Sequence, residues 1–464
     1  MYSLSRARAD PRTLMTTGVL ALSLAAAVVF GTLSPVQLDL PNPIPWQSLA
    51  ATAAAATAGV THPSATHSTT TNNPTSTDPT TANPRHPDPM APPLRATATQ
   101  NHAWWQSLTP AQQAEVVIEH PERVGNLDGI PMSVRNRVDR AQLAARIASL
   151  TAAEPSRYVM PGDVVGGAVA LPNPAYAVWQ NKMAALTNTR KALQAHPDMS
   201  LVMLVVGAER VDIALAVGDV DTADNVGVYA QGLFSNTSDD VDVRDVSLQM
   251  LDLDRQADQL IALSKRRDQT TALVMWMGYA APQNLIDAMS ETQAQEGAVS
   301  LASFADGIKA VNPATRLVGV GHSYGSTTLG LAAQRTNAFS ALVAFGSPGL
   351  GTDRVRDLHV PSGAVYALAN PVDPVAGLGR FGTVPTEMPG VTRLSTAAHL
   401  DLKGPTATPV SLKSVASGIV GPVIAFVANL PTGFRQHNQY LVHDSTAEYN
   451  IAAVIADLPD RLIR

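Results

Sequence analysis

Cysteine is absent from the 464-residue chain, and only 15% of its residues are charged. Without cysteine the chain cannot form a disulfide, a thiolate zinc or iron–sulfur site, or a cysteine nucleophile. Lysine and arginine number 32 against 38 aspartates and glutamates, so the net charge is -6, and no basic cluster is present. This charge argues against nucleic acid as a partner. The chain also lacks a Walker A motif, an HExxH motif and a GxGxxG motif directly after a strand, so we expect neither a cofactor nor a metal ion.

The N-terminus carries a membrane signal. Three arginines precede residues 13–38, which contain no charge and are most apolar at residues 14–33. Such a run is long enough to span a bilayer, whereas a cleaved signal peptide has an apolar centre of about 7–15 residues. We therefore assign residues 1–40 to a signal peptide or signal-anchor and favour the uncleaved anchor. The arginines would stay in the cytoplasm, which predicts an extracellular or cell-envelope location for the rest of the chain.

Two segments follow this signal. Residues 41–100 are rich in alanine, threonine and proline and show no apolar periodicity, so we expect a disordered stalk. We expect the protein to contact the membrane through its N-terminal segment. Residues 101–464 contain no internal repeat and suffice for one large domain.

That domain alternates helical and strand-like segments. Short apolar runs rich in β-branched residues are typical of strands that helices cover on both faces. The expected strands are residues 201–206, 213–217, 226–229, 272–277, 316–320, 341–345 and 364–368. The expected helices are residues 134–150, 175–195 and 297–310, one that begins at Pro110 after a Thr109 cap, and a last one after a capping box at residues 445–448. The pattern predicts an α/β fold with a mainly parallel sheet and an N-terminal helical extension.

A strand-to-helix turn carries the candidate nucleophile. It reads Gly321-His322-Ser323-Tyr324-Gly325, directly after an apolar strand and at the start of a helix. In the G-x-S-x-G elbow the serine occupies a strained turn and projects its hydroxyl above the sheet, while the two glycines allow close packing. We predict that Ser323 is the nucleophile. His322 points away from it by its backbone position and is expected to pack beside the elbow.

A serine nucleophile needs a base, and the base needs an orienting carboxylate that precedes it in the chain. Asp373 follows the expected strand 364–368 and would lie on a loop at the carboxyl edge of the sheet. Asp353, Asp357 and Asp401 have no comparable strand before them. We predict Asp373 as the acid, with a turn residue held by neighbouring prolines as the alternative.

Three histidines beyond Asp373 compete for the role of base. His437 lies in the polar loop RQHNQY just before the last helix, and this position favours it. His443 is the alternative base, although it could serve only to support the cap of that helix. His399 follows a strand-like segment and is the least favoured.

The oxyanion hole requires two N–H groups that face the developing charge. We expect one from the Tyr324 backbone and one from Gly232 or Leu233, in the loop after the expected strand 226–229; a plain turn is the alternative for that loop. The acidic segment GDVDTAD lacks the spacing of a calcium loop, and we interpret it as a turn between two strands.

Several further motifs occur in a fixed order. They are WWQSLTPAQQ, ERVGNLDGIP followed by Arg135 and Asn136, GDVDTADNV, WMGYAAP, GHSYGS and HNQY, from Trp104 to the C-terminal part. Together they resemble an actinobacterial α/β-hydrolase family of largely unknown function. The resemblance implies the α/β-hydrolase fold, Ser323 as nucleophile, and His437 as the base in a His-x-x-Tyr pattern with Tyr440. Members of the family often carry proline where this chain has Gln231, directly before Gly232.

These residues predict an exported serine hydrolase that cleaves carboxylic esters through an acyl-enzyme, with a small-molecule or lipid-like ester as substrate. The apolar residues 400–430 are expected to form either a lid over acyl chains or a helix of the domain surface. Two alternatives remain. An acyltransferase acting on cell-envelope acceptors would use the same residues, and a non-catalytic binding protein would keep the fold without a working triad.

Overall fold

The computed structural model describes residues 91, 93, 95–159, 170–397 and 436–464. The expected membrane signal, most of the expected stalk and the apolar residues 400–430 lie outside these residues. Within the described ranges, no helix has both the length and the apolar character needed to cross a bilayer. The first described helix, α3, begins at Ala98, so regular structure starts inside the segment that we expected to be a stalk.

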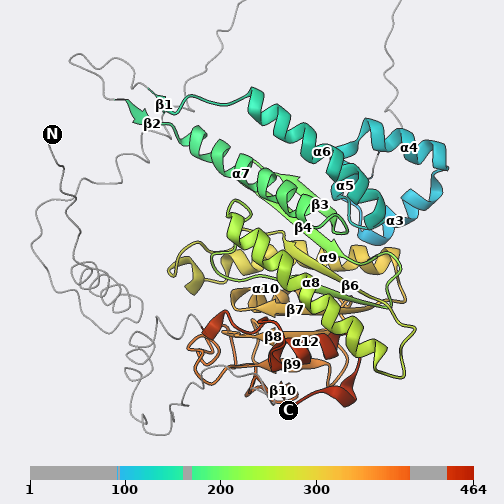
Figure 1. Cartoon of the computed structure of the whole chain (residues 1–464), viewed down its shortest axis with the longest axis vertical. Coiled ribbons are helices and arrows are strands. Elements are labelled where there is room, and N and C mark those ends of the chain that lie inside the picture. Colours follow the sequence, from blue (N-terminus) through green and yellow to red (C-terminus); the bar gives the residue numbers. More distant parts are fainter. Residues whose placement is uncertain (1–90, 92, 94, 160–169, 398–435) are drawn as a thin grey trace, which may run out of the picture. The chain divides into compact units, whose positions relative to one another are not determined.

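An eight-stranded sheet forms the centre of the described part, in the order β10-β9-β8-β7-β5-β6-β4-β3 (Figure 1). The strands are β3 Ser200–Val206, β4 Val211–Val217, β5 Asn225–Ala230, β6 Thr271–Met277, β7 Arg316–His322, β8 Ala341–Phe345, β9 Val365–Leu368 and β10 Thr392–Leu394. All neighbours run parallel except that β4 is antiparallel to both β3 and β6. A separate two-stranded ribbon pairs β1 Tyr158–Val159 with β2 Leu171–Pro172. The prediction of a mainly parallel sheet is confirmed.

Helices cover both faces of this sheet. Before the sheet come α3 Ala98–Ser107, α4 Pro110–Glu119, α5 Pro121–Asn126 and α6 Met132–Ala152; the others are α7 Pro174–Ala195, α8 Asp240–Ala262, α9 Thr292–Val311, α10 Tyr324–Ala333 and α12 Thr446–Ile455. Helices α7, α8 and α12 share one hydrophobic core with the sheet, and α9 and α10 share the other (Figure 1). On β6, Met275 enters the first core, whereas Val274 and Trp276 enter the second. This two-sided burial explains why the strands read as continuous apolar runs.

The N-terminal helices cover the open edge of the sheet at β3. The Asn126 amide bonds both backbone groups of Leu204, donating to its carbonyl at 2.8 Å and accepting from its N–H at 3.1 Å. Asn136 Oδ1 accepts from the Leu201 N–H at 2.9 Å. An unpaired strand edge is a template for association, so these asparagines satisfy groups that would otherwise invite pairing. The motif GNLDGIP and the asparagine after it therefore have a structural role.

The acidic turn between β4 and β5 has a second structural role. Asp219 closes the turn, as we expected, by accepting from the Asp221 N–H at 3.0 Å. The Asp221 carboxylate reaches the start of α6 and accepts from the N–H groups of Met132 and Ser133 at 2.6 and 2.9 Å. Helix α6 has proline at its N-cap and no cap from its own side chains, so Asp221 caps it from outside.

The two helix starts for which we predicted caps have different outcomes. Thr109 caps α4, which begins at Pro110, and the prediction is confirmed with a complete capping box. Ser445 caps α12 by accepting from the Glu448 N–H at 3.1 Å, but the reciprocal bond is absent. The Glu448 carboxylate accepts from the Asp444 N–H at 2.7 Å instead. The predicted capping box of α12 is therefore wrong in its second hydrogen bond, from the Ser445 N–H to Glu448. Asp444 has a positive φ, and its own N–H bonds the carboxylate instead.

Candidate functional site

Ser323 lies at the turn between β7 and α10. Its backbone has a φ of 54° and a ψ of -132°. A non-glycine residue with this backbone is strained, and such strain persists only where surrounding contacts hold it. The Ser323 N–H donates to the Phe345 carbonyl at 3.0 Å, and its carbonyl accepts from the Ser326 N–H at 3.0 Å. Strand β8 and the first turn of α10 therefore fix the strained serine.

The two glycines of the elbow are needed for close approach. A Cβ at Gly321 would lie 2.6 Å from Ser326 Cα, and one at Gly325 would lie 2.4 Å from the carbonyl oxygens of Ala230 and Gln231. Both are clashes with backbone, which cannot move aside as a flexible side chain could. Glycine thus lets α10 start directly against the ends of β5 and β7.

Asp373 and His437 form a buried pair at the same edge of the sheet. His437 Nδ1 lies 2.9 Å from Asp373 Oδ2, and the two side chains are 6% and 0% exposed. Asp373 follows β9, as the sequence predicted. Its other oxygen accepts from the N–H groups of Val375 and Ala376 at 2.8 and 3.4 Å, which fixes the plane of the carboxylate.

The Tyr440 hydroxyl is the fourth donor to the Asp373 carboxylate. It donates to Asp373 Oδ2 at 2.7 Å and accepts from the Asn370 N–H at 2.7 Å. Burial opposes ionisation of Asp373, but the hydrogen bonds from His437 and Tyr440 outweigh it and hold its pKa below the usual value. The carboxylate is therefore ionised at neutral pH and can orient an imidazole.

His322 joins the elbow to this pair. Its Nε2–H donates to the His437 carbonyl at 2.9 Å, and its ring stacks on Phe345 with centroids 5.0 Å apart. The rings of His322 and His437 lie 4.7 Å apart. Burial, followed by the nearby His437, lowers the pKa of His322 to about 3, so this ring is neutral. His322 packs beside the elbow, as we expected, and its hydrogen bond holds the backbone of His437 close to the elbow.

The loop after β5 touches the elbow at Gly232. A Cβ there would lie 2.7 Å from Ser323 Cβ and 3.1 Å from the Tyr324 nitrogen. The backbone N–H groups of Tyr324 and Leu233 donate to no acceptor among the residues that the structure describes. Tyr324 also begins α10, whose N-terminus carries partial positive charge. Gly232 therefore lies against both Ser323 and the Tyr324 nitrogen, and the oxyanion hole from Tyr324 with Gly232 or Leu233 stays a prediction.

Comparisons with known proteins agree with this architecture. A family model described as alpha/beta hydrolase matches residues 207–383. The "Uncharacterized protein Rv0963c" of Mycobacterium tuberculosis (strain ATCC 25618 / H37Rv) is 33% identical over 231 residues, which cover 47% of this chain and 86% of that protein. The chain belongs to the alpha/beta hydrolase family. A second protein of this strain, "Uncharacterized protein Rv2079", is 28% identical over 320 residues, covering 63% of this hydrolase and 46% of the relative.

Solved structures are similar over shorter parts of the chain. A dienelactone hydrolase from Anabaena variabilis ATCC 29413 has 15% identity and a TM-score of 0.28, covering 42% of this hydrolase and 84% of that chain. A Trichoderma reesei cutinase has 19% identity and a TM-score of 0.25, with 34% and 66% covered. The matched family model includes Ser323 and Asp373, whereas His437 lies beyond it.

The structure of the hydrolase places the other candidate residues elsewhere. The side chain of His443 is 58% exposed and lies 4.0 Å from Asp252 and 3.5 Å from Asp444. Asp353 accepts from Thr383 Oγ1, and Asp357 pairs with Arg354. His399 and Asp401 lie outside the described residues.

Asn370 is a site residue that the sequence did not single out. Besides its backbone bond to Tyr440, its side-chain amide donates to Gln436 Oε1 at 3.1 Å. Asn370 thereby joins the loop of Asp373 to residues that lie before and after His437 in the chain. The available signal was its position directly after β9, three residues before the acid, but its partners lie 66 and 70 residues away.

A cavity of about 180 Å³ adjoins the oxyanion loop on the side of β6. Gln231 and Trp276 line it, and the buried donors Gln231 Nε2 and Trp276 Nε1 have no hydrogen-bond partner in the described part of the chain. Gly278 leaves room for the indole, since a Cβ there would lie 2.5 Å from the Trp276 ring. Buried donors without a partner are rare, so we propose that an acceptor oxygen of a ligand in this cavity could satisfy them.

Proposed function

We propose that this hydrolase is a serine esterase that cleaves carboxylic esters through an acyl-enzyme. One observation carries the proposal. Ser323 occupies a strained elbow, and the adjoining His322 bonds the backbone of His437, whose ring pairs with the ionised Asp373. This arrangement supports Ser323 as nucleophile, His437 as base and Asp373 as orienting acid, in the chain order expected for this fold.

The reaction follows from the hydrogen bonds of these residues. With Nδ1–H donated to Asp373, the neutral His437 ring carries its lone pair on Nε2, which accepts the proton from Ser323 Oγ as the oxygen attacks the ester carbonyl. The N–H groups of Tyr324 and of Gly232 or Leu233 stabilise the oxyanion. His437 then protonates the departing alcohol, and water releases the acid by the same steps in reverse.

Covalent labelling tests this assignment. The full chain is treated with a fluorophosphonate probe, and wild type is compared with Ser323→Ala and His437→Ala. We expect labelling to be lost in both variants and kept in Ser300→Ala, which removes an exposed serine of α9. Labelling of Ser323→Ala, or no labelling of folded wild type, would refute the proposal. Loss in His443→Ala but not in His437→Ala would assign the base to His443.

Product analysis separates hydrolysis from acyl transfer. The active protein is incubated with an ester, with and without an acceptor alcohol, and the products are measured by mass spectrometry. We expect the free acid to dominate in both cases. A transesterified product that dominates at low alcohol concentration would instead support the acyltransferase alternative.

The cavity beside the oxyanion loop supports an ester that carries a further acceptor oxygen. Trp276→Phe removes the indole N–H while keeping an aromatic ring. We expect kcat/KM to fall about tenfold for an ester with an ether oxygen near the scissile carbonyl and to change less than about twofold for its methylene isostere. Equal changes for both esters would exclude this role of Trp276.

We also propose that the hydrolase is exported, since residues 1–40 combine an arginine-rich start with an apolar run. Fractionation of cells that express the tagged full chain tests this proposal. We expect the protein in the membrane or envelope fraction, accessible to added protease in spheroplasts, and in the cytosol when residues 13–38 are deleted. Protection of the intact chain from protease would refute it.

A further inference from the structure

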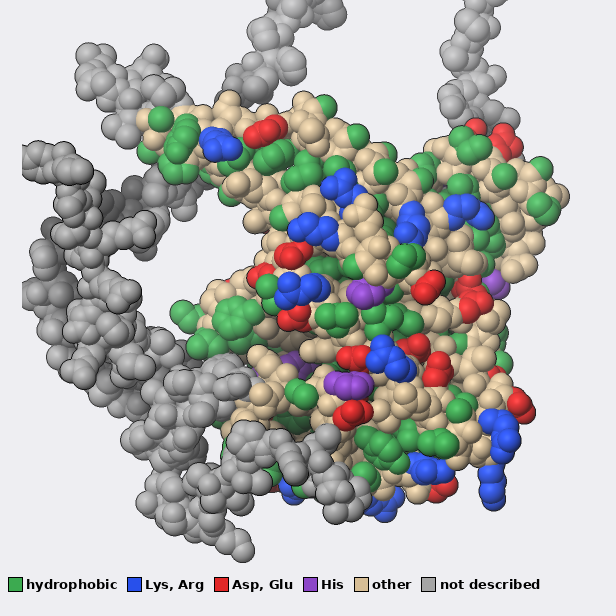
Figure 2. Space-filling model, viewed as in Figure 1, with side chains coloured by type: hydrophobic (Ala, Val, Ile, Leu, Met, Phe, Trp, Pro, Cys, Tyr) green, Lys and Arg blue, Asp and Glu red, His purple; other side chains and the backbone are tan. Residues whose placement is uncertain are grey.

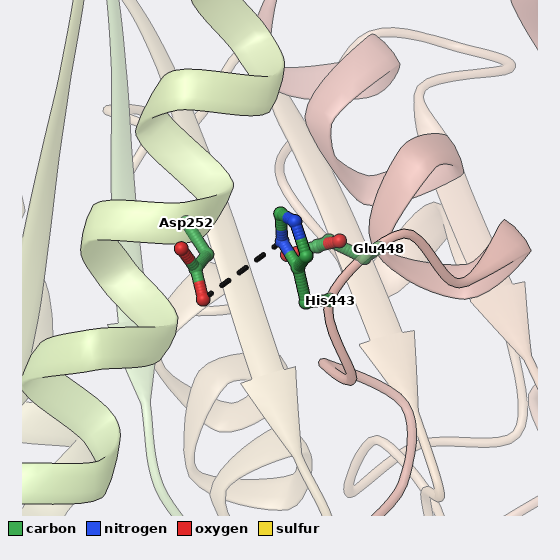
Figure 3. Close-up of side chains that lie close together, drawn as sticks. All are labelled: Asp252, His443 and Glu448. Carbon is green, nitrogen blue, oxygen red and sulfur yellow. Dashed lines mark ion pairs between the residues drawn. The ribbon is translucent and has the colours of Figure 1, made fainter.

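Three side chains meet beside α12, outside the candidate active site. Asp252 comes from α8, His443 from the turn before α12 and Glu448 from the first turn of α12 (Figure 3). One ligand atom of each lies within 4.8 Å of those of the other two. His443 Nδ1 is 4.0 Å from Asp252 Oδ2, and its ring lies between the two carboxylates (Figure 3).

Glu448 shows that this cluster is incomplete. The residue is only 1% exposed, and its Oε1 is buried without a hydrogen-bond partner among the described residues. Its Oε2 is occupied by the Asp444 N–H at 2.7 Å. A buried carboxylate oxygen without a donor costs free energy, because it has lost water and gained nothing in exchange. Asp252 cannot supply a donor when ionised, so either a proton on Glu448 or a bound cation would satisfy Oε1, and the nearby His443 and Asp252 are the further ligands that a cation needs.

We propose that Asp252, His443 and Glu448 bind one divalent cation of the class of Zn²⁺. One imidazole nitrogen and two carboxylate oxygens are ligands that Zn²⁺ accepts, and water would complete the tetrahedron. Mg²⁺ and Ca²⁺ prefer all-oxygen sites, so they should bind more weakly. Tetrahedral Zn²⁺ places its ligand atoms about 3.3 Å apart. The side chains of His443 and Asp252 are 58% and 31% exposed and have room to rotate toward the buried Glu448.

The bound ion would tie α8 to the segment that carries the proposed base. His437 and Tyr440 precede His443 in the same segment, and Ser445 Oγ donates to the Tyr440 carbonyl at 3.1 Å. The site is therefore structural, since its ligands differ from Ser323, Asp373 and His437. No local sequence pattern marks this cluster, because Asp252 lies far from the other two residues in the chain.

Zinc binding to the full chain tests the proposal. The protein is purified without a histidine tag, stripped with chelator and titrated with Zn²⁺ by calorimetry, with Mg²⁺ and Ca²⁺ in parallel. We compare wild type with Glu448→Gln and His443→Ala; the glutamine keeps the size of the side chain and an acceptor for Asp444. His359→Ala, which removes an exposed histidine elsewhere, is the matched control. Histidines outside the described residues are present in every variant, so their contribution cancels.

We expect one Zn²⁺ site in wild type and His359→Ala that weakens at least about tenfold in both Glu448→Gln and His443→Ala. A hundredfold excess of Zn²⁺ over Kd should also raise the unfolding temperature of wild type by about 3 to 5 °C, and of neither ligand variant. Equal Zn²⁺ binding in all four proteins, or none in wild type, would refute the site. His443 is exposed, so its variant remains informative even if Glu448→Gln fails to fold.

Discussion

Asp373 shows how individual contacts set the chemistry of one residue. Four donors surround its carboxylate: the His437 ring, the Tyr440 hydroxyl and two backbone N–H groups. Burial alone would raise the pKa of Asp373, and these bonds reverse that effect. We therefore propose that Tyr440 acts on the reaction through Asp373 as a positioning residue.

Replacing Tyr440 by Phe removes one hydrogen bond to an ionised group. We expect kcat/KM for an ester to fall about tenfold to a hundredfold. The pKa of Asp373 should rise, so the acidic limb of the pH profile should move to higher pH. Kinetics across pH and circular dichroism check this prediction, with Tyr449→Phe on α12 as the control. An unchanged profile in a folded Tyr440→Phe would show that the hydroxyl does not act through Asp373.

Asp139 should make the free energy of unfolding depend on pH. It is 1% exposed on α6, its Oδ2 has no partner in the described residues, and burial, partly offset by Arg135, raises its pKa to about 8. Between the unfolded pKa near 3.8 and pH 8, the folded state holds a proton that the unfolded state has lost. The free energy of unfolding should therefore decrease as pH rises through this window, by up to about 1.4 kcal/mol per unit.

Asp139→Asn should remove this decrease, because the amide has no proton to lose. Urea unfolding at pH 6 and pH 8 measures it, and Asp198→Asn, at an exposed position, is the control. The same pH slope in wild type and Asp139→Asn would mean that Asp139 is ionised in the folded state.

At the scale of elements, α6 depends on a residue outside itself. Its first N–H groups are satisfied by Asp221 from the loop between β4 and β5, which joins the N-terminal helices to the sheet. A negative charge at this end also interacts favourably with the helix dipole.

Asp221→Ala should lower the free energy of unfolding by about 1 to 2 kcal/mol, the usual effect of losing an N-cap. Denaturation in urea measures the change, and Asp268→Ala, an exposed acid in the turn before β6, should have little effect. Equal stability of the two variants would show that water replaces the cap without loss.

At the scale of the whole domain, the N-terminal helices complete the sheet at its β3 edge. On the face shown in Figure 2, basic and acidic side chains are interspersed, and no large patch of one sign is visible. Such a surface agrees with the small net charge of -6.

Asn126→Ala should expose the backbone of Leu204 on β3. We expect the free energy of unfolding to fall by about 1 to 2 kcal/mol and the protein to associate as its concentration rises. Urea unfolding and light scattering measure these effects, and Asn337→Ala, at an exposed position, is the control. A monomer at all concentrations would show that the remaining contacts of α5 and α6 suffice to protect the edge.

The elements could be predicted because their signals are local. The apolar runs of β3 to β9 and the cap at Thr109 lie within a few residues of what they specify. The capping box predicted for α12 was only half formed. The spacing of Ser445 and Glu448 was correct, but the Asp444 N–H took the Glu448 carboxylate as its acceptor.

The sequence by itself determined the succession of helices and strands along the chain and the elbow at Ser323, because glycine spacing and apolar periodicity act over short distances. Only the tertiary structure decided which histidine meets Asp373, since the two partners lie 64 residues apart and packing of Tyr440 and His322 brings them together. The same applies to Asp221 at α6 and to Asp252 at His443. Contacts between distant segments depend on how the helices pack on the sheet, which no local pattern records.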